Sequence, residues 1–167
     1  IEECEFVTFD TELSGLNRKR DEIVAIGAIR VKNLQICCGE TFYALVKPEK
    51  SLHTDSTLIH QITPQELVEA ESLADVLPRF VEFCGDSFLI GHYVGLDVGF
   101  VNRAVQKFMG GYIHNPSLDT MRLAMAHKEL QHGHYFNHYE RQSSYNLAEL
   151  SKEYGLPEFA QHDALQD

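Results

Sequence analysis

Three segments in the first third of the chain are rich in Val, Ile, Phe and Tyr, and short polar turns separate them. They cover residues 4 to 10, 23 to 31 and about 35 to 47, with NRKRD and KN between them. Apolar runs that are broken in this way by turn residues predict strands connected as hairpins. The chain is therefore expected to begin with three consecutive strands.

After Pro48 the apolar positions follow a helical period instead. Ser72 is a suitable N-cap for a helix, and FLI at 88 to 90 predicts a short buried strand after that helix. The buried stripe of the helix keeps a spacing of three and four residues and consists of Leu73, Val76, Leu77, Phe80, Val81 and Cys84.

Two further helices are expected near the end of the chain. Asp119 opens the helical stretch DTMRLAMAHKEL, and Asn146 caps a shorter helix that stops at Gly155 and Pro157. The segment between them, residues 131 to 144, has no period and predicts a long surface loop. Strands followed by alternating helices and strands indicate an α/β sandwich around a mixed sheet, in one domain over residues 1–167.

Composition restricts the function. The formal net charge of −11 argues against broad adhesion to nucleic acid or to an anionic membrane, but it does not exclude a nucleic-acid enzyme whose acidic site collects cations. No apolar run approaches the ~20 residues of a membrane span, and no signal peptide is recognisable, which predicts a cytoplasmic protein. The four cysteines form no CxxC pair and are expected to be reduced core thiols. The chain starts without Met and is expected to be part of a longer one.

Two carboxylates stand at the end of the first predicted strand, in FDTELSGL. Residues i and i+2 of a strand share a face, so Asp10 and Glu12 are expected to project together. Gly15 then allows the backbone to turn sharply and to approach a ligand closely. Taken alone, the pair is explained more simply as a solvated strand end.

Asp97 is the acidic member of a second helical stripe, whose other members are Phe100, Val101, Ala104, Val105 and Phe108. A buried carboxylate must be neutralised, hydrogen-bonded or bound to a cation, because its unpaired charge is very costly. Its position in the first helical turn favours the charged form through the helix dipole. A structural role as a helix cap is the alternative.

The ending HDALQD supplies a histidine and further carboxylates. If all six residues were helical, His162 and Asp167 would point about 140° apart. They converge only if His162 lies on a loop and Asp167 on the helix that follows. Asp163 competes with Asp167 for any role assigned here.

Together these residues suit metal-dependent cleavage of a phosphodiester. Hard divalent cations prefer oxygen ligands. Two such ions about 4 Å apart hold the attacking water and the leaving oxygen of an in-line displacement. A histidine, which ordinarily titrates near neutral pH, can take the proton of that water.

The residues resemble the DEDDh 3′ to 5′ exonucleases, a family that includes the proofreading epsilon subunit of bacterial DNA polymerase III. FDTELSGL is similar to the first motif of that family, GHYVGLDVGFV to the second, and HDALQD to the third, H-x-A-x-x-D. Weaker landmarks are EIVAIGAI, IHQIT, SLDTMRLA and LAELSKEYGLP. The motifs occur in order over nearly the whole chain.

The resemblance implies an α/β, ribonuclease H-like fold with a five-stranded mixed sheet flanked by helices. It implies two divalent cations, Mg²⁺ or Mn²⁺, with His162 as general base and with metal ligands at Asp10, Glu12, Asp97 and Asp167. The residues that would hold the terminal nucleotide are Thr11, Leu16, His60 and Phe100. Leu16 and Phe100 are equally suited to the core. Asp119 and Asp163 are left without a catalytic role.

The expected function is removal of 5′-mononucleotides from the 3′ end of single-stranded DNA or RNA, of the proofreading or repair type, with a DNA polymerase or further domains of the same chain as possible partners. The alternatives are an oligoribonuclease-like enzyme acting on short RNA, and an inactive nucleic-acid-binding or polymerase-docking module. Two positions depart from the family: Tyr93 replaces the usual Asn, and Leu96 the usual aromatic residue.

Two other features remain open or are set aside. His132, His134 and His138 have no matching Cys or acidic partner nearby, so a solvated loop explains them better than a zinc site. The basic run from Arg18 to Arg20 fits contact with substrate phosphates and a plain hairpin turn about equally well.

Overall fold

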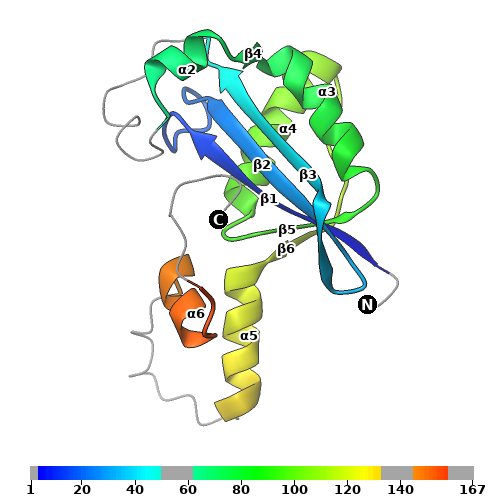
Figure 1. Cartoon of the computed structure of the whole chain (residues 1–167), viewed down its shortest axis with the longest axis vertical. Helices are drawn as coiled ribbons and strands as arrows, with labels where there is room; N and C mark the ends of the chain where they lie inside the picture. The colour runs from blue at the N-terminus through cyan, green and yellow to red at the C-terminus, as the bar shows by residue number, and fades with distance from the viewer. Residues whose placement is uncertain (1–3, 50–61, 133–144, 158–167) are drawn as a thin grey trace.

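The computed structural model describes residues 4–49, 62–132 and 145–157. Within these ranges the centre of the protein is a six-stranded mixed sheet with the strand order β4-β3-β2-β1-β5-β6 (Figure 1). The three antiparallel strands are β1 (Glu5–Leu13), β2 (Ile23–Lys32) and β3 (Gln35–Lys47). On the other side of β1, β5 (Phe88–Gly91) and β6 (Ser117–Asp119) run parallel to it. The expected mixed α/β sheet is confirmed.

The expected number of five strands differs from the six strands that the structure describes. The sheet includes β4 (Glu71–Ser72), which pairs in parallel with Val46 and Lys47 at the end of β3. Both β4 residues have exposed side chains, so no alternation of apolar and polar positions marks this strand in the sequence.

The strand β2 is buried along its first half because it has a neighbouring strand on each side and apolar side chains on both faces. Ile23 and Ile26 are buried in the main core, whereas Val24 and Ala25 belong to a smaller cluster with Leu67. Leu67 lies on α2 (Pro64–Val68). The two clusters therefore occupy opposite faces of this part of the sheet.

Two long helices pack together against the main core and cover one face of the sheet (Figure 1). In α3 (Leu73–Cys84), Ser72 is the N-cap and accepts from the backbone N–H of Asp75, as the sequence predicts. The ring of Phe80 on α3 packs 5.5 Å from the ring of Phe9 on β1. In α4 (Gly95–Met109) the predicted stripe is buried except for Phe108, which is 37% exposed.

The remaining described helices, α5 (Thr120–His132) and α6 (Leu147–Glu153), lie side by side at the end of the molecule away from α2 (Figure 1). An ion pair of 2.7 Å joins Lys128 to Glu153 across them. Asn146 caps α6 by accepting from the backbone N–H of Glu149, which confirms the predicted cap. Most of the predicted long loop lies outside the described residues.

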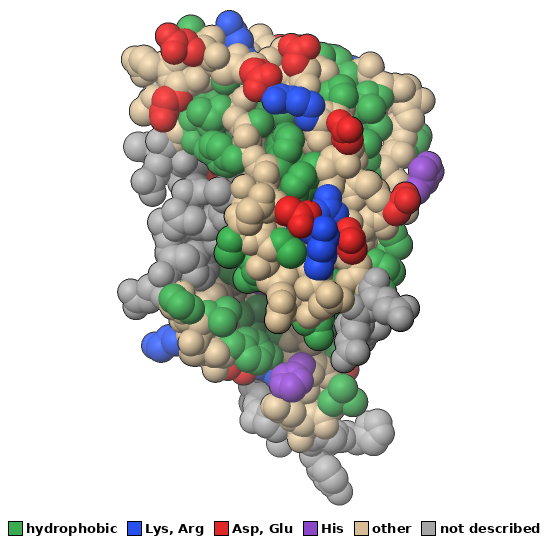
Figure 2. Space-filling view, turned by 45° about the vertical axis from the view of Figure 1, so that its right-hand side comes forward, with side chains coloured by type: hydrophobic (Ala, Val, Ile, Leu, Met, Phe, Trp, Pro, Cys, Tyr) green, Lys and Arg blue, Asp and Glu red, His purple; other side chains and the backbone are tan. Residues whose placement is uncertain are grey.

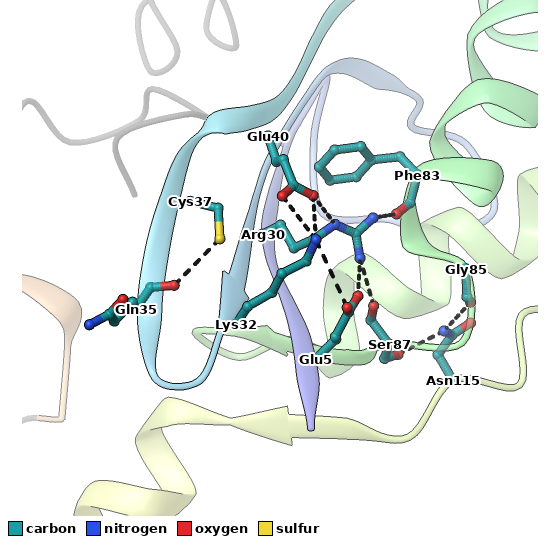
Figure 3. Close-up of polar contacts among 10 residues, drawn as sticks. All are labelled: Glu5, Arg30, Lys32, Gln35, Cys37, Glu40, Phe83, Gly85, Ser87 and Asn115. Atoms are coloured by element: carbon teal, nitrogen blue, oxygen red, sulfur yellow. Dashed lines mark hydrogen bonds and ion pairs between the residues drawn. The ribbon is translucent and has the colours of Figure 1, made fainter. Parts of the chain in front are cut away.

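Arg30 joins β1, β2, β3 and the end of α3 through one guanidinium group (Figure 3). Its nitrogens pair with Glu5 at 3.2 Å and Glu40 at 3.0 Å and donate to Ser87 and to the carbonyl of Phe83. Figure 2 shows basic side chains lying beside acidic ones on this face. Neighbouring charges of opposite sign thus largely compensate one another here.

None of the described cysteines forms a disulfide, but their expected burial is only partly correct. Cys84 is buried in the core, and burial raises the pKa of its thiol to about 12. Cys38 is exposed because it lies on a stretch of β3 that is largely open to solvent. No helix among the described residues is long and apolar enough to cross a bilayer.

Candidate active site

The end of β1 carries Asp10 and Glu12 beyond the point where its parallel neighbour stops. The pairing of β1 with β5 ends at Thr8, whereas the pairing with β2 continues opposite Asp10 and Glu12. Gly91, the last residue of β5, lies so close to β1 that an added Cβ would be 2.9 Å from the carbonyl oxygen of Phe9. The sheet is therefore open on one side of the two carboxylates.

The burial pattern of β1 changes at the same place. Val7, Phe9 and Thr11 are buried on alternate positions, but Glu12 is also buried, with 7% of its surface exposed. At the register irregularity between Glu12 and Leu13 the extra residue is Val24 on β2, because Glu12 pairs with Ala25 and Leu13 pairs with Ile23. Glu12 therefore lies directly beside a bulge of the neighbouring strand.

Asp97 lies in the first turn of α4 and is 4% exposed, which confirms that it occupies the buried face. Its Oδ1 accepts from the hydroxyl of Thr11 at 2.5 Å and from the backbone N–H of Thr11 at 3.2 Å. Because Thr11 stands between Asp10 and Glu12, this contact brings the helix carboxylate to the strand that carries the other two.

Burial raises the pKa of Asp97 from 3.8 to about 6, because a charged carboxylate loses its hydration there. The hydrogen bonds from Thr11 and the nearby charge of Arg18 act in the opposite direction and favour the carboxylate. The protonation state of this side chain is therefore sensitive to any further positive charge in the site.

The segment 14–22, which follows β1, is held in one shape by its own hydrogen bonds. Ser14 and Glu22 exchange backbone and hydroxyl contacts of 2.8 and 2.9 Å. Arg18 donates to the carbonyl of Gly95 at 2.6 Å, at the start of α4. An added Cβ on Gly99 would lie 2.5 Å from Cζ of Arg18, so the guanidinium packs directly on the bare backbone of the helix. The segment is thus tied to the turn that carries Asp97.

Tyr93 adopts a left-handed backbone conformation with φ of 54°, in the turn that leads into α4. Asn tolerates this conformation better than Tyr, which gives a physical reason for the Asn of the family motif. The Tyr93 backbone N–H donates to Asp119 at 3.2 Å, and Asp119 also accepts from Met121 at 3.0 Å. These contacts give Asp119 a structural role. The structure gives no reason for Leu96 at the position where the family has an aromatic residue.

The predicted nucleotide-binding residues have different surroundings. The hydroxyl of Thr11 is directed to Asp97, Leu16 is 75% exposed, and Phe100 is fully buried in the core. The exposed position of Leu16 suits contact with a ligand, whereas Phe100 takes the core position that its sequence equally allowed. His60 lies outside the described residues. All four roles stay predictions.

Sequence reasoning missed two local features of this site. Nδ1 of His92 forms a hydrogen bond of 2.9 Å with the hydroxyl of Thr120, which connects the end of β5 to the start of α5. The His92 ring also makes an edge-to-face contact with the ring of Tyr93. The hydroxyl of Thr11 supports Asp97. The sequence could not predict this contact, because it joins residues that are 86 positions apart.

The donor chemistry of Asp10, Glu12 and Asp97 fits a hard divalent cation such as Mg²⁺ or Mn²⁺, since all three supply carboxylate oxygens. Burial of Asp97 in a site without a formal positive charge bonded to it is consistent with this fit. In the part of the chain that the structure describes, no three acidic, histidine or cysteine side chains lie close enough to hold an ion by themselves. His162, Asp163 and Asp167 lie outside that part.

The structure does not test the three histidines for which a zinc site was set aside. His132 is the last residue of α5. His134 and His138 lie outside the described residues.

The chain is similar to known exonuclease and DNA polymerase III sequences. Residues 7–167 match the exonuclease family RNase_T. DNA polymerase III PolC-type of Thermotoga maritima is 32% identical over 162 residues, which is 97% of this chain and 11% of that protein. DNA polymerase III subunit epsilon of Aquifex aeolicus is 30% identical over 97% of this chain and 74% of that protein. The chain thus spans about a tenth of the PolC-type relative.

A solved structure supports the fold. E. coli exonuclease I in complex with a dA16 oligonucleotide has a TM-score of 0.81 to this chain, with 21% sequence identity. The match covers 98% of this chain and 38% of that protein. At this identity the comparison shows a shared fold.

Proposed function

Because this chain belongs to the RNase_T exonuclease family, we propose that it removes 5′-mononucleotides one at a time from the 3′ end of a single-stranded nucleic acid. The observation that carries the proposal is the contact of Asp97 with Thr11, the residue between Asp10 and Glu12. This contact supports the proposal because it ties the helix turn that carries Asp97 to the strand that carries Asp10 and Glu12.

In the proposed reaction, water attacks the terminal phosphodiester and the bond to the 3′-oxygen of the preceding nucleotide breaks. His162 takes a proton from the water, Glu12 helps to orient it, and the shortened strand leaves with a 3′-hydroxyl. Leu16, which is exposed beside this region, contacts the terminal base through its apolar side chain.

Asp10, Glu12, Asp97 and Asp167 are the residues that would hold two divalent cations, Mg²⁺ or Mn²⁺. Such ions, when bound, stabilise the negative charge that develops on the phosphate and favour deprotonation of water. The buried carboxylate of Asp97 favours a cation for a physical reason, because burial disfavours its negative charge and a cation would offset that cost.

The relatives are named as DNA polymerase III proteins, which supports a DNA substrate and a proofreading or repair role. The proposed location is the cytoplasm. A DNA polymerase, or further domains of the same chain, is the proposed partner. Neither an enzyme restricted to short RNA nor an inactive docking module is favoured by a particular contact in the structure.

The test uses 3′- and 5′-labelled DNA and RNA oligonucleotides with Mg²⁺ or Mn²⁺. Stepwise shortening from the 3′ end is expected, and EDTA or Asp10→Ala should abolish it. Preference for dinucleotide RNA over longer DNA would favour the short-RNA enzyme instead. Failure to shorten any of these substrates from the 3′ end, in a chain that extends past Asp167, would contradict the exonuclease function.

A further inference from the structure

A cavity of about 360 Å³ lies beside the segment that follows β1, between the end of β3, the start of α3 and the second half of α4. Its floor is apolar and includes Ile23, Val46 and Phe108. Its basic lining residues come from three separate stretches of sequence, and they are Lys19, Arg20, Lys47, Arg103 and Lys107.

The charge of this cavity, which we call the basic pocket, is opposite to that of the chain as a whole. Its lining has five basic and only two acidic residues, Glu22 and Glu49, in a chain with 14 basic and 25 acidic residues. Random placement would give an acidic excess. The pocket therefore concentrates positive charge on an otherwise acidic protein.

Two of these cations are available for a ligand. Lys19 and Lys47 are exposed, and neither forms an ion pair with any residue that the structure describes. Lys107, by contrast, pairs with Glu49 at 2.5 Å and lies over the ring of Phe108. The start of α3 also lines the pocket, and the N-terminus of a helix adds partial positive charge.

The backbone around the basic pocket is held in place by hydrogen bonds within the protein. Arg103 donates to the backbone carbonyl of Asp21, and Arg18 donates to the carbonyl of Gly95. These two contacts fix the segment 14–22 to α4 at both ends of the stretch that carries Lys19 and Arg20. A ligand would therefore meet basic groups whose backbone positions are already set.

The pocket also lies in a suitable position relative to the carboxylates. Arg103 follows Asp97 by six residues on the same helix, a rise of about 9 Å. The segment 14–22, which follows the strand that carries Asp10 and Glu12, supplies Lys19, Arg20 and Glu22 to the pocket. A single nucleic-acid strand whose end lies at the carboxylates can reach the pocket within a few nucleotides.

We infer that the basic pocket binds a nucleotide of the substrate strand upstream of the scissile bond, with its phosphates on Lys19 and Lys47 and its base or sugar against the apolar floor. This inference rests on the proposed function for the identity of the strand. An apolar floor with a cationic rim matches a nucleotide, which has an apolar ring face and a charged phosphate. A negatively charged peptide has no equivalent flat apolar group in each residue.

The test compares Lys19→Glu and Lys47→Glu with Lys152→Glu, which reverses an exposed charge on α6. Binding of a fluorescent single strand of about ten nucleotides is measured between 50 and 300 mM salt, roughly the range over which phosphate contacts dominate affinity, in an Asp10→Ala background that prevents turnover. Each pocket variant should weaken binding about tenfold at low salt and reduce the salt slope by about 0.7, as expected for one lost contact to a single strand. Lys152→Glu should leave the slope unchanged.

A second measurement separates this inference from the proposed function. With Asp10 restored, the pocket variants should cleave a dinucleotide as fast as the unaltered chain but show a raised KM for the longer strand. Equal effects of the Lys47 and Lys152 variants, or strand binding that is unchanged by the pocket variants, would overturn the pocket while leaving any 3′ trimming intact. Loss of binding confined to the pocket variants, in a chain that trims no 3′ end, would support the pocket and reject the exonuclease function.

Discussion

Asp97 holds a carboxylate where either a proton or a cation is needed to offset the loss of hydration. The group is 4% exposed and its pKa is raised to about 6, with two hydrogen bonds from Thr11 opposing the rise. The residue that is most useful for binding a cation is thus unfavourable for folding in the absence of one. Folding and function make opposite demands on this side chain.

Removal of this buried charge should stabilise the metal-free protein. The folded state binds a proton more tightly than the unfolded state between the ordinary pKa of 3.8 and the folded pKa of about 6. The unfolding free energy of the unaltered chain should therefore fall as pH rises through this window, by about 3 kcal/mol at most. Asp97→Asn should lack this fall, so the two curves diverge above pH 4 and run parallel above about pH 6.

The measurement is urea denaturation in EDTA from pH 4 to about 8, which spans the titration of this carboxyl. The exposed Asp86→Asn serves as the control for charge removal and should follow the unaltered chain. Parallel curves for Asp97→Asn and the unaltered chain over the whole range would contradict the buried-charge account.

Thr11 should act as a positioning residue for Asp97. Thr11→Val keeps the shape of the side chain but leaves the buried carboxylate without its hydroxyl donor, which costs about 1–3 kcal/mol of stability near neutral pH. Loss of a supporting hydrogen bond should also weaken metal affinity or activity by roughly tenfold or more. Thr11→Ser, which keeps the hydroxyl, should behave like the unaltered chain in denaturation and in metal titration of activity. Equal losses in the Ser and Val variants would exclude the hydroxyl as the cause.

Tyr93 should be replaceable with a gain in stability. Its φ of 54° lies in the left-handed region, which disfavours a side chain with an ordinary Cβ by about 1–2 kcal/mol. Tyr93→Asn should therefore raise the unfolding free energy by up to about 1 kcal/mol, because Asn tolerates this conformation better. Tyr93→Phe keeps the strain and should give no gain. A thermal midpoint that is equal for all three proteins would contradict the strain.

At the scale of elements, segment 14–22 and α4 form one unit through Arg18. The guanidinium donates to Gly95 and packs on Gly99, a glycine that would otherwise weaken the middle of a helix. The absence of a side chain at Gly99 thus has a reason in the packing of the neighbouring segment.

A double-mutant cycle should detect this packing. In an Arg18→Ala background, Gly99→Ala should stabilise the protein by about 1 kcal/mol through helix propensity. With Arg18 present the same change should stabilise less, because the new Cβ displaces the guanidinium from 2.5 Å. Chemical denaturation of the four proteins gives the coupling energy, and an additive cycle would show that Arg18 and Gly99 do not interact.

At the scale of the whole molecule, strand β1 connects the core to the candidate site. Its first half packs through Val7 and Phe9 into the main core, and its end carries the acidic residues past the last pairing with β5. Cations bound at this end would act on the stability of the entire domain, because they neutralise repulsion that the fold has to overcome.

Metal should therefore stabilise the folded chain. A hundredfold excess of Mn²⁺ or Mg²⁺ over its dissociation constant should raise the unfolding free energy by about 2.7 kcal/mol. The gain should vanish with EDTA and be smaller in Asp10→Ala. If the metal raised the thermal midpoint equally in the unaltered chain and in Asp10→Ala, the stabilising ion would not be bound at Asp10.

Much of the fold was predictable because it follows local patterns. The period of apolar residues predicted β2, α3 and α4, and the caps Ser72 and Asn146 were predicted by residue type. Short elements were missed: β4 has two exposed residues, and β6 was interpreted as the start of a helix at Asp119. Elements of two or three residues are too short to show a period, and their neighbours in the sheet determine them.

The sequence by itself determined which side chains are acidic, which stripe of α4 is apolar and that Asp97 interrupts it, because these are properties of residue order. Only the tertiary structure decided that Thr11 donates a hydrogen bond to Asp97, that Tyr93 is strained and that five basic residues from three stretches line one pocket. Contacts between distant residues depend on the path of the chain through space, and no local period records that path.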